Sequence, residues 1–467
     1  MTGAPVTLAY LVAASLFILG LKRLSSPRTA RAGNRMAASG MLIGVVAALL
    51  SEQILNPVEL IGGLAVGGLI GVVLARRTAL TDMPELVAAF NGFGGAASAL
   101  VAGAEVLREA ALPEADLDPI VALTVGLSVL IGGVTLTGSF LAVAKLRGSN
   151  ANGFPGLRLV SVAVGLGTLG ALGLLVASAS PEAGLPWLGA LVACALVLGV
   201  LLVLPIGGAD MPVVVALLNS YSGMAAAATG FVLGNYALVI SGALVGASGL
   251  ILTRIMCEAM NRSLANVLLG GFGAEAGAAA SGGGDEDRTV RSTTTDDAAL
   301  MMAYAGRVVV VPGYGLAVAQ AQHEVRELAD LLQKEGVEVA YAIHPVAGRM
   351  PGHMNVLLAE ASVPYDQLIE MDEINPEMPQ VDVVLVVGAN DVVNPGARDD
   401  ETSPIYGMPV INADEAQQVI VMKRSMSTGY AGIQNPLFFN DNTQMLFGDA
   451  KVSLKGIVSD LKDLQAA

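Results

Sequence analysis

The stretch Arg307-Val-Val-Val-Val-Pro-Gly313-Tyr-Gly315-Leu-Ala-Val318 decides the fold of the second half of this chain. Four consecutive valines are typical of a strand that is buried on both faces of a parallel sheet. The glycines that follow predict a tight turn into a helix, which is the arrangement that holds a pyrophosphate in dinucleotide-binding folds. Val318 stands where the fingerprint has its third glycine, so the motif gains its weight from the strand–turn–helix context.

From Arg307 onward the sequence alternates expected strands and helices. The strands are expected at Val308–Val311, Val337–Ile343, Gln367–Met371, Val381–Val387, Val419–Lys423 and Met445–Phe447. The helices are expected at Leu316–Lys334, His353–Ala361 and Lys451–Leu464. This alternation predicts an α/β Rossmann-like domain with a mostly parallel sheet over residues 306–467.

The first half of the chain has the composition of a membrane protein. The whole chain is 54% hydrophobic and only 14% charged, and its mean hydropathy is +0.65. About nine stretches are apolar enough to span a bilayer, and they centre on Val6–Leu21, Met36–Leu50, Leu60–Leu74, Met83–Val106, Ile120–Ala144, Leu159–Ala177, Trp187–Pro205, Met211–Leu233 and Tyr236–Met256. We therefore expect a polytopic α-helical membrane domain over residues 1–262 and a linker rich in alanine, glycine and serine over residues 263–305.

Glycine spacing and basic residues predict how the spans pack and how they are oriented. Gly63, Gly67 and Gly71 recur at four-residue intervals in the third span, a pattern typical of tight helix packing. Lysine and arginine residues cluster after the first, third and fifth spans and are scarce in the opposite loops. The positive-inside rule then places the N-terminus outside and the C-terminal domain in the cytoplasm.

Charge, cysteine and histidine content exclude several classes of protein. A net charge of −15 argues against nucleic-acid binding. Cys194 and Cys257 are too few for a disulfide framework and show no metal-binding spacing, so we expect no metal site. All three histidines lie in the soluble half, which argues against haem held within the membrane.

Several polar residues lie inside the expected spans. Asn91 and Ser98 are seven residues apart in the fourth span, and Asn219 and Ser222 are three apart in the eighth, so each pair shares a helix face. The fourth and eighth spans open on the same motif, Asp82-Met-Pro in the fourth and Asp210-Met-Pro in the eighth. Polar groups in lipid are functional candidates, although interhelical hydrogen bonds or helix capping also explain them.

Basic residues near two strand ends favour NADP over NAD. An NAD site usually has an acidic residue at the end of the second strand, and this chain has His344 there with Arg349 close behind. Lys423-Arg424-Ser425 directly follows an apolar strand and offers two charges and a hydroxyl to a dianionic phosphate. The alternative is a solvated basic strand end.

Longer blocks of sequence point to one family. These blocks are Met83-Pro-Glu-Leu-Val87, Asp210-Met-Pro-Val-Val214, Leu218-Asn-Ser-Tyr-Ser-Gly223, Met256-Cys-Glu-Ala-Met-Asn-Arg262, Pro312-Gly-Tyr-Gly-Leu-Ala-Val-Ala-Gln320, His344-Pro-Val-Ala-Gly-Arg349, Gly388-Ala-Asn-Asp-Val-Val-Asn-Pro395, Lys423-Arg-Ser-Met-Ser-Thr-Gly-Tyr-Ala-Gly-Ile-Gln-Asn-Pro436 and Leu446-Phe-Gly-Asp-Ala450. Over nearly its whole length the chain resembles the β subunit of the proton-translocating NAD(P) transhydrogenase.

The resemblance implies a division of labour between subunits. This chain would bind NADP(H), and an α-type partner with membrane helices would bind NAD(H). Hydride would pass directly between the two nicotinamides, in the Si-specific/Re-specific sense, while a proton crosses the membrane domain. The resemblance further implies a dimer of such complexes in the cell inner membrane.

The resemblance also assigns site residues. The NADP(H) site would comprise Gly313, Tyr314, Gly315, Ala317, Val318, Arg349, Gly388, Asn390, Asp391, Lys423, Arg424, Ser425 and Tyr430. Within this set, Lys423, Arg424 and Ser425 would hold the 2′-phosphate. Catalysis and the proton path would use Asp391, Tyr430, Asn91, Asp210, Asn219, Ser248, Gly249 and Arg262. Asp391 would sense protonation near the nicotinamide, and the segment 429–436 would act as a lid.

One residue departs from the family pattern. Many members have a histidine where this chain has Asn91, and asparagine does not take up a proton near neutral pH. The proton route past Asn91 would then use water or a titratable group from a partner helix.

Two other classes of protein also fit parts of the sequence. A transporter or channel with a regulatory NADP-sensing domain would have a substrate-sized polar cavity and no partner enzyme. A membrane oxidoreductase that delivers electrons to quinone would need flavin, haem or an iron–sulfur cluster. Neither class explains the long blocks around Asp391 and Lys423.

Overall fold

The computed structural model describes residues 4–24, 26–51, 57–112, 116–149, 153–207, 210–261, 263–269, 289–350, 352–429 and 431–466. The chain forms two compact units, Met1–Arg254 and Ile255–Ala467, and each is described by itself.

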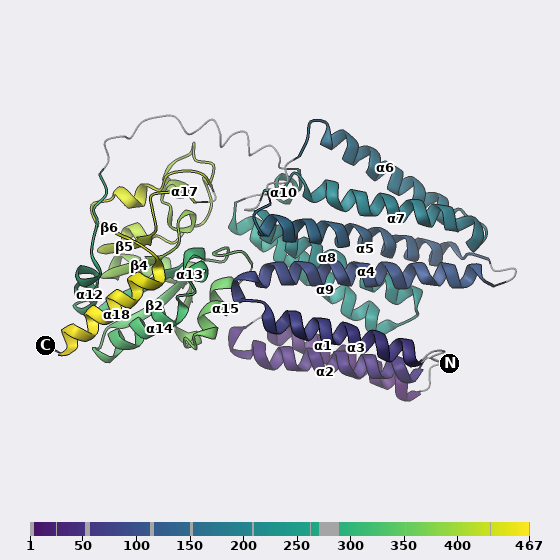
Figure 1. The fold of residues 1–467 in the computed structure, drawn as a ribbon, viewed down its shortest axis with the longest axis horizontal. Helices are drawn as coiled ribbons and strands as arrows, with labels where there is room; N and C mark the ends of the chain where they lie inside the picture. The colour runs from purple at the N-terminus through teal and green to yellow at the C-terminus, as the bar shows by residue number, and fades with distance from the viewer. Residues whose placement is uncertain are drawn as a thin grey trace. The chain divides into compact units, whose positions relative to one another are not determined.

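The first unit consists of long apolar helices that run side by side (Figure 1). They are α1 (Ala4–Leu24), α2 (Pro27–Ser51), α3 (Pro57–Arg77), α4 (Met83–Ala110), α5 (Pro119–Leu146), α6 (Leu157–Val176), α7 (Pro181–Val203), α8 (Met211–Val232) and α9 (Tyr236–Ala259). Within the described residues, nine helices are long and apolar enough to cross a membrane, which confirms the expected spans. Helix α5 packs against α4, α7 and α8, so it occupies the centre of the unit.

Small residues let several of these helices approach at backbone distance. A Cβ on Gly95 of α4 would lie 2.7 Å from the carbonyl oxygen of Gly132 in α5. Between α8 and α9, a Cβ on Gly223 would lie 2.5 Å from the backbone nitrogen of Gly246. Close packing through glycine therefore joins α4 to α5 and α8 to α9, and these helices carry the polar residues discussed below.

The glycines of α3 behave differently from this pattern. A Cβ on Gly63, Gly67 or Gly71 would meet no atom within 4 Å. No described part of this chain packs closely against these three glycines, so the predicted tight contact is not seen here.

The second unit is built on a six-stranded parallel sheet with the order β3-β2-β1-β4-β5-β6. The strands are β1 (Arg307–Pro312), β2 (Glu338–Ile343), β3 (Leu368–Glu370), β4 (Val383–Val387), β5 (Gln418–Lys423) and β6 (Thr443–Phe447). The order reverses between β1 and β4, which makes this pair the topological switch point of a doubly wound fold. The expected α/β class and parallel sheet are confirmed.

Helices cover one face of the sheet and short turns cover the other. Val308 and Val310 pack on the helical side with α12 (Thr295–Ala303), α13 (Tyr314–Ala319), α14 (Gln322–Lys334), α15 (His353–Glu360) and α18 (Ala450–Ala466). Val309 and Val311 pack on the opposite side with α16 (Met371–Ile374), η4 (Asn375–Gln380), η5 (Asp391–Val393), η6 (Ala413–Glu415) and η7 (Pro436–Phe439). Successive valines of β1 thus supply both cores, as expected for a strand buried on both faces.

The long helix expected at Leu316–Lys334 is two helices. Gln320 adopts a left-handed conformation with φ of 49°, which ends α13, and α14 begins at Gln322. The prediction of one continuous helix was wrong because a side-chain pattern does not report a single left-handed residue.

Residues that the sequence placed in the linker form part of this unit. The backbone nitrogen of Thr293 donates to Met445 of β6 at 3.0 Å, and Met445 donates to Arg291 at 2.7 Å. Helix α12 follows and buries Ala298 and Met302 completely. The packed structure therefore begins well before Gly306, since main-chain pairing with β6 and burial by α18 order this stretch.

Candidate functional site

The two glycine turns at the switch point press against each other. The backbone nitrogen of Gly313 donates to Val387, and that of Gly315 donates to Gly388, both at 2.9 Å. Gly388 has φ of 66°, a conformation that favours glycine, and a Cβ on Gly315 would lie 2.6 Å from the Gly388 Cα. The turns after β1 and β4 therefore form one thin ledge at the carboxyl ends of the strands, the position where doubly wound folds bind ligands.

Two residues predicted to contact the nucleotide stack at this edge. The guanidinium carbon of Arg349 lies 4.4 Å from the ring centroid of Tyr314, which is cation–π distance. Ala317 is completely buried in the core of the sheet's helical side, whereas Val318 is 43% exposed on α13. Tyr314 and Arg349 therefore place an aromatic ring and a guanidinium at this edge, while Ala317 packs α13 onto the core.

The histidine at the end of β2 has a structural role in this unit. His344 is 2% exposed, and its Nδ1 accepts the N–H of Val346 at 3.2 Å. Its Nε2 therefore carries the proton and donates to the carbonyl of Pro409 at 2.8 Å. Burial lowers the pKa of His344 to about 4, even though the Pro409 hydrogen bond favours the charged form. His344 is neutral at physiological pH and holds the 409 loop against β2.

The loop after β4 is tied to the segment that the sequence predicts as a lid. The backbone nitrogen of Ala431 donates to Oδ2 of Asp391 at 3.0 Å. A Cβ on Gly429 would lie 2.7 Å from Nδ2 of Asn390 and would also clash with the Asp391 carboxylate. Only glycine at position 429 lets the segment approach this carboxylate so closely.

Two buried asparagines that the sequence reasoning did not assign complete this contact. Asn435 donates to the carbonyl of Asn390 at 3.0 Å, and Asn394 donates to that of Gln434 at 3.2 Å. Each asparagine also accepts an N–H two residues ahead, at 3.0 Å for Asn435 and 2.9 Å for Asn394. Both precede a proline, and the repeated Asn-Pro signal for a turn could have revealed them.

In the basic cluster after β5, the Lys423 side chain contacts other described residues, whereas the Arg424 side chain forms no hydrogen bond or ion pair with them. Lys423 donates to the carbonyl of Ser427 at 2.5 Å and lies 4.8 Å from the ring centroid of Phe438. Burial lowers the pKa of Lys423, and the nearby charge of Asp391 opposes that shift. Arg424 and Ser425 are exposed; Ser425 contacts Ser427 at 3.1 Å between hydroxyls. No hydrogen bond or ion pair joins the Arg424 side chain to another described residue, so its guanidinium is available to an anion.

Part of the predicted lid segment lines a small cavity. Its volume is about 50 Å³, and its walls come from Asn390, Met426, Ser427, Thr428, Ile433, Gln434, Asn435, Phe438 and Phe439. The Asn390 Nδ2 is buried and has no hydrogen-bond partner in the part of the chain that the structure describes. Sites for drug-sized ligands are usually several hundred Å³, so a dinucleotide would enter here only if this segment moved.

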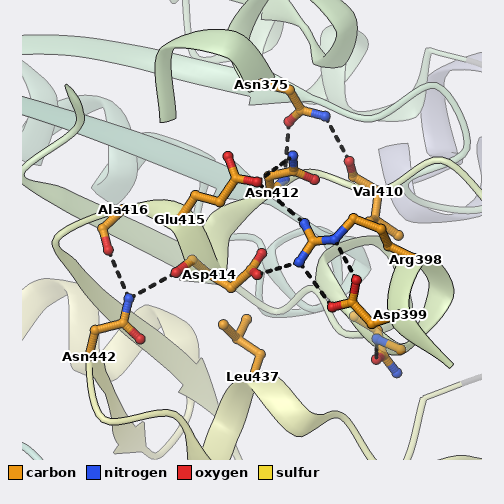
Figure 2. Close-up of polar contacts among 12 residues, drawn as sticks. Asn375, Arg398, Asp399, Val410, Asn412, Asp414, Glu415, Ala416, Leu437 and Asn442 are labelled. Atoms are coloured by element: carbon orange, nitrogen blue, oxygen red, sulfur yellow. Dashed lines mark hydrogen bonds and ion pairs between the residues drawn. The ribbon is translucent and has the colours of Figure 1, made fainter. Parts of the chain in front are cut away.

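An ion-pair network anchors the chain just beyond this loop (Figure 2). Arg398 in α17 (Gly396–Asp399) donates to Asp399 at 2.9 Å and to Asp414 of η6 at 2.7 Å. These hydrogen bonds raise the pKa of Arg398 and lower that of Asp399. Asn442 adds hydrogen bonds to the carbonyls of Asp414 and Ala416 at 3.0 and 2.8 Å. Sequence reasoning did not identify this anchor, which fixes the far end of the Asp391 loop to the sheet.

In the membrane unit, the structure brings together two of the predicted polar residues. Asn91 is 7% exposed, and its Oδ1 accepts a hydrogen bond from Asn219 at 3.3 Å. Its Nδ2 donates to the carbonyl of Val215 at 3.4 Å. An amide pair thus links α4 to α8 in the interior of the unit.

A second polar contact links three helices farther along α4. The hydroxyls of Ser128 and Thr229 lie 2.7 Å apart, and both residues are buried. Both hydroxyls reach the carbonyl oxygen of Ser98, at 3.3 and 3.2 Å. Sequence reasoning found Ser98 but not its partners, because a single hydroxyl in an apolar helix gives no pattern.

The remaining described residues of the predicted proton path make no hydrogen bond to Asn91 or Asn219, although Gly249 packs against Ser220, the neighbour of Asn219. Asp210 is 7% exposed at the start of α8 and makes no side-chain cap hydrogen bond. Ser248 is exposed and donates to Val245 of its own helix at 3.0 Å, while a Cβ on Gly249 would lie 2.7 Å from the Ser220 nitrogen. Arg262 and Tyr430 lie outside the described residues. Among the residues that are described, no cluster of histidine, cysteine and carboxylate groups could hold a metal ion.

Together these features define a polytopic membrane protein that carries a doubly wound α/β domain with basic residues at one strand edge. The family model for the NAD(P) transhydrogenase beta subunit matches residues 6–460 of the chain. Two proteins named NAD(P) transhydrogenase subunit beta, both from Rhodospirillum rubrum, are 50% identical to it over 464 residues, covering 98% of this chain and 99% of theirs. The chain belongs to the transhydrogenase beta subunit family, which implies an alpha-subunit partner.

Proposed function

We propose that this chain binds NADP(H) at the carboxyl edge of its sheet and couples hydride transfer to proton movement across a membrane. An α-type partner subunit with membrane helices would bind NAD(H), and hydride would pass between the nicotinamides in the Si-specific/Re-specific sense. The complex would work as a dimer in the cell inner membrane, with the N-terminus outside and the C-terminal domain in the cytoplasm.

The observation that carries the nucleotide proposal is that Arg424, at the end of the strand beside β4, has no ion-pair partner among the described residues. The β1–β4 switch point supplies the ledge, and β5, the neighbour of β4, ends at Lys423. Arg424 pairs with no carboxylate among the described residues, which fits a 2′-phosphate as its partner. The partnerless Nδ2 of Asn390 supplies a buried donor within the same strand edge. The residues present therefore fit NADP(H).

The glycine ledge and the stacked pair account for the rest of the proposed site. Gly313, Gly315 and Gly388 let the turns after β1 and β4 pack backbone against backbone, and this paired turn would lie at the pyrophosphate. Arg349, stacked on Tyr314, adds a cation at the end of the neighbouring strand β2. When bound, NADP(H) supplies the hydride donor or acceptor.

Asp391 can convert protonation into movement of the lid segment. As a carboxylate, its Oδ2 is a strong acceptor for the Ala431 N–H at 3.0 Å. Protonation would weaken this charge-assisted hydrogen bond by about 1 kcal/mol and would remove the attraction to Lys423. A lid that opens more easily when Asp391 is protonated links nucleotide affinity to a proton.

Asn91 and Asn219 supply the proposed position for proton passage in the membrane unit. Both side chains carry donors and acceptors, so they can orient water although neither takes up a proton. A group that takes up a proton near neutral pH would come from a partner helix, because this chain has no histidine in its membrane half. The nearly buried carboxylate of Asp210, at the start of α8, and the residue Arg262 would mark the cytoplasmic mouth.

The experiment compares Asn91→Leu with wild type in vesicles that contain this chain and its partner subunit. Internal pH and hydride transfer are followed together. Asn91→Leu should slow proton-coupled turnover while NADPH binding stays unchanged, because it removes both a donor and an acceptor.

Thr168→Val is the matched control. Thr168 is buried in α6, and its hydroxyl donates to Val164 of its own helix at 2.7 Å. This variant should pump normally. If Asn91→Leu pumps protons at the wild-type rate, the proton route lies elsewhere. If the wild-type complex does not bind NADPH, the cofactor assignment is refuted.

A further inference from the structure

His353 has an unusual pattern of contacts in the soluble unit. It is the first residue of α15, it is 1% exposed, and its Nδ1 accepts the backbone N–H of Arg349 at 3.0 Å. In the neutral ring, the proton must then lie on Nε2. That nitrogen is buried, and no described residue forms a hydrogen bond with it. Among the described residues, the only hydrogen bond of this buried ring therefore goes to the main chain of Arg349.

The backbone around His353 is shaped to allow this contact. Gly348 has φ of 102°, and a Cβ at that position would lie 2.5 Å from Nδ1 of His353. A larger residue at 348 would displace the ring from the Arg349 N–H. The ring centroid of His353 also lies 6.3 Å from that of Tyr314, the aromatic ring on which the Arg349 guanidinium stacks. His353 thus supports both the main chain of Arg349 and the platform beneath its side chain.

We propose that His353 is a positioning residue for NADP(H) binding: it fixes Arg349 at the strand edge and contacts no nucleotide atom itself. This inference rests on the proposed function, in which Arg349 faces the nucleotide. A side chain that is already held loses less conformational freedom when an anion binds. His353 would therefore raise nucleotide affinity by pre-organising Arg349.

The second buried histidine gives an internal comparison. His344 also accepts a backbone N–H through Nδ1, from Val346 at 3.2 Å, but its Nε2 has a protein partner in Pro409. His344 closes its hydrogen bonds within the scaffold. The hydrogen bond of His353 instead goes to Arg349, whose side chain would face the nucleotide.

The experiment replaces His353 with asparagine and with glutamine in the complete complex and measures NADPH affinity by the fluorescence of the bound nucleotide. The amide oxygen of asparagine can occupy the place of Nδ1, whereas the longer glutamine places its amide nearer to Nε2. His353→Asn should bind NADPH within about threefold of wild type, and His353→Gln should bind about tenfold more weakly, the effect of one lost hydrogen bond. His323→Gln, at an exposed position of α14, is the control and should bind normally.

A double-mutant cycle with Arg349→Ala separates positioning from a general structural role. If His353 acts through Arg349, His353→Gln should add less than twofold to the loss already caused by Arg349→Ala. Full additivity, or a glutamine variant that binds better than the asparagine variant, would overturn the proposal. Failure of wild type to bind NADPH would instead refute the proposed function, so the two outcomes are distinct. If the glutamine variant does not fold, His353→Asn alone decides, because an affinity loss of tenfold or more in that variant contradicts the role of the Nδ1 acceptor.

Discussion

Removing the charge of Arg424 tests the phosphate assignment without disturbing the fold. The Arg424 side chain is exposed and has no hydrogen-bond or ion-pair partner among the described residues. Surface changes away from such contacts usually alter stability by less than about 0.5 kcal/mol. Arg424→Ala should therefore leave the thermal unfolding midpoint of the complex nearly unchanged.

The same change should weaken NADP(H) binding strongly. A hydrogen bond to a charged group contributes about 1.5–3 kcal/mol, and solvent screening at this exposed position favours the lower end of that range. A loss of about 2 kcal/mol corresponds to roughly a 30-fold increase in Kd. Binding of NADH, which has no 2′-phosphate, should change by less than about twofold at the partner's site.

Separate fluorescence titrations of NADPH and of NADH into the detergent-solubilised complex measure the two affinities. Lys334→Ala is the charge-matched control, since Lys334 is an exposed residue in the last turn of α14 and lies away from the carboxyl ends of the strands. The control variant should bind NADPH like wild type. Equal NADPH affinity of Arg424→Ala and wild type would exclude Arg424 as a ligand of the 2′-phosphate.

Three further predictions concern the scaffold. Burial lowers the pKa of His344 to about 4, so its neutral form stabilises the fold by about 3 kcal/mol above about pH 6.5, and this contribution is lost as pH falls toward 4. Chemical denaturation between pH 7 and 4.5 should therefore show that His344→Asn loses less free energy of unfolding than wild type. Gly388→Ala should cost several kcal/mol because its Cβ would lie 2.7 Å from the Leu316 nitrogen, whereas Gly336→Ala, also at positive φ but in open space, should cost only about 1 kcal/mol; thermal melts compare the two. A fragment from residue 289 should melt above one from residue 306, because the longer fragment buries Met302 of α12; equal melting temperatures would contradict this packing.

The sequence predicted the parts of the fold that depend on a repeated pattern. Each expected span became a helix because twenty apolar residues leave few alternatives in lipid. Each expected strand of the α/β domain formed within a few residues of its predicted bounds, since runs such as Val308–Val311 need cover on both faces. Single-residue events escaped prediction: the left-handed Gln320 divides one helix into two, and no periodicity reports such a residue.

The candidate site was predictable where chemistry follows directly on a strand. Arg424 and the glycine ledge lie at strand ends that the sequence located. Asn394 and Asn435 were not predicted as site residues, because they act through hydrogen bonds between segments about 40 residues apart. The contact of Asn91 with Asn219 likewise joins helices that sequence spacing cannot pair.

An imposed pH gradient tests the proposed coupling of hydride transfer to proton movement. Vesicles containing this chain and its partner subunit would be held at a known gradient while the equilibrium between NADH with NADP⁺ and NAD⁺ with NADPH is read by absorbance and nucleotide assay. If one proton crosses for each hydride, every pH unit of gradient contributes about 1.4 kcal/mol and shifts the equilibrium ratio about tenfold. An equilibrium ratio that stays the same with and without the gradient, in vesicles shown to hold it, would contradict the account.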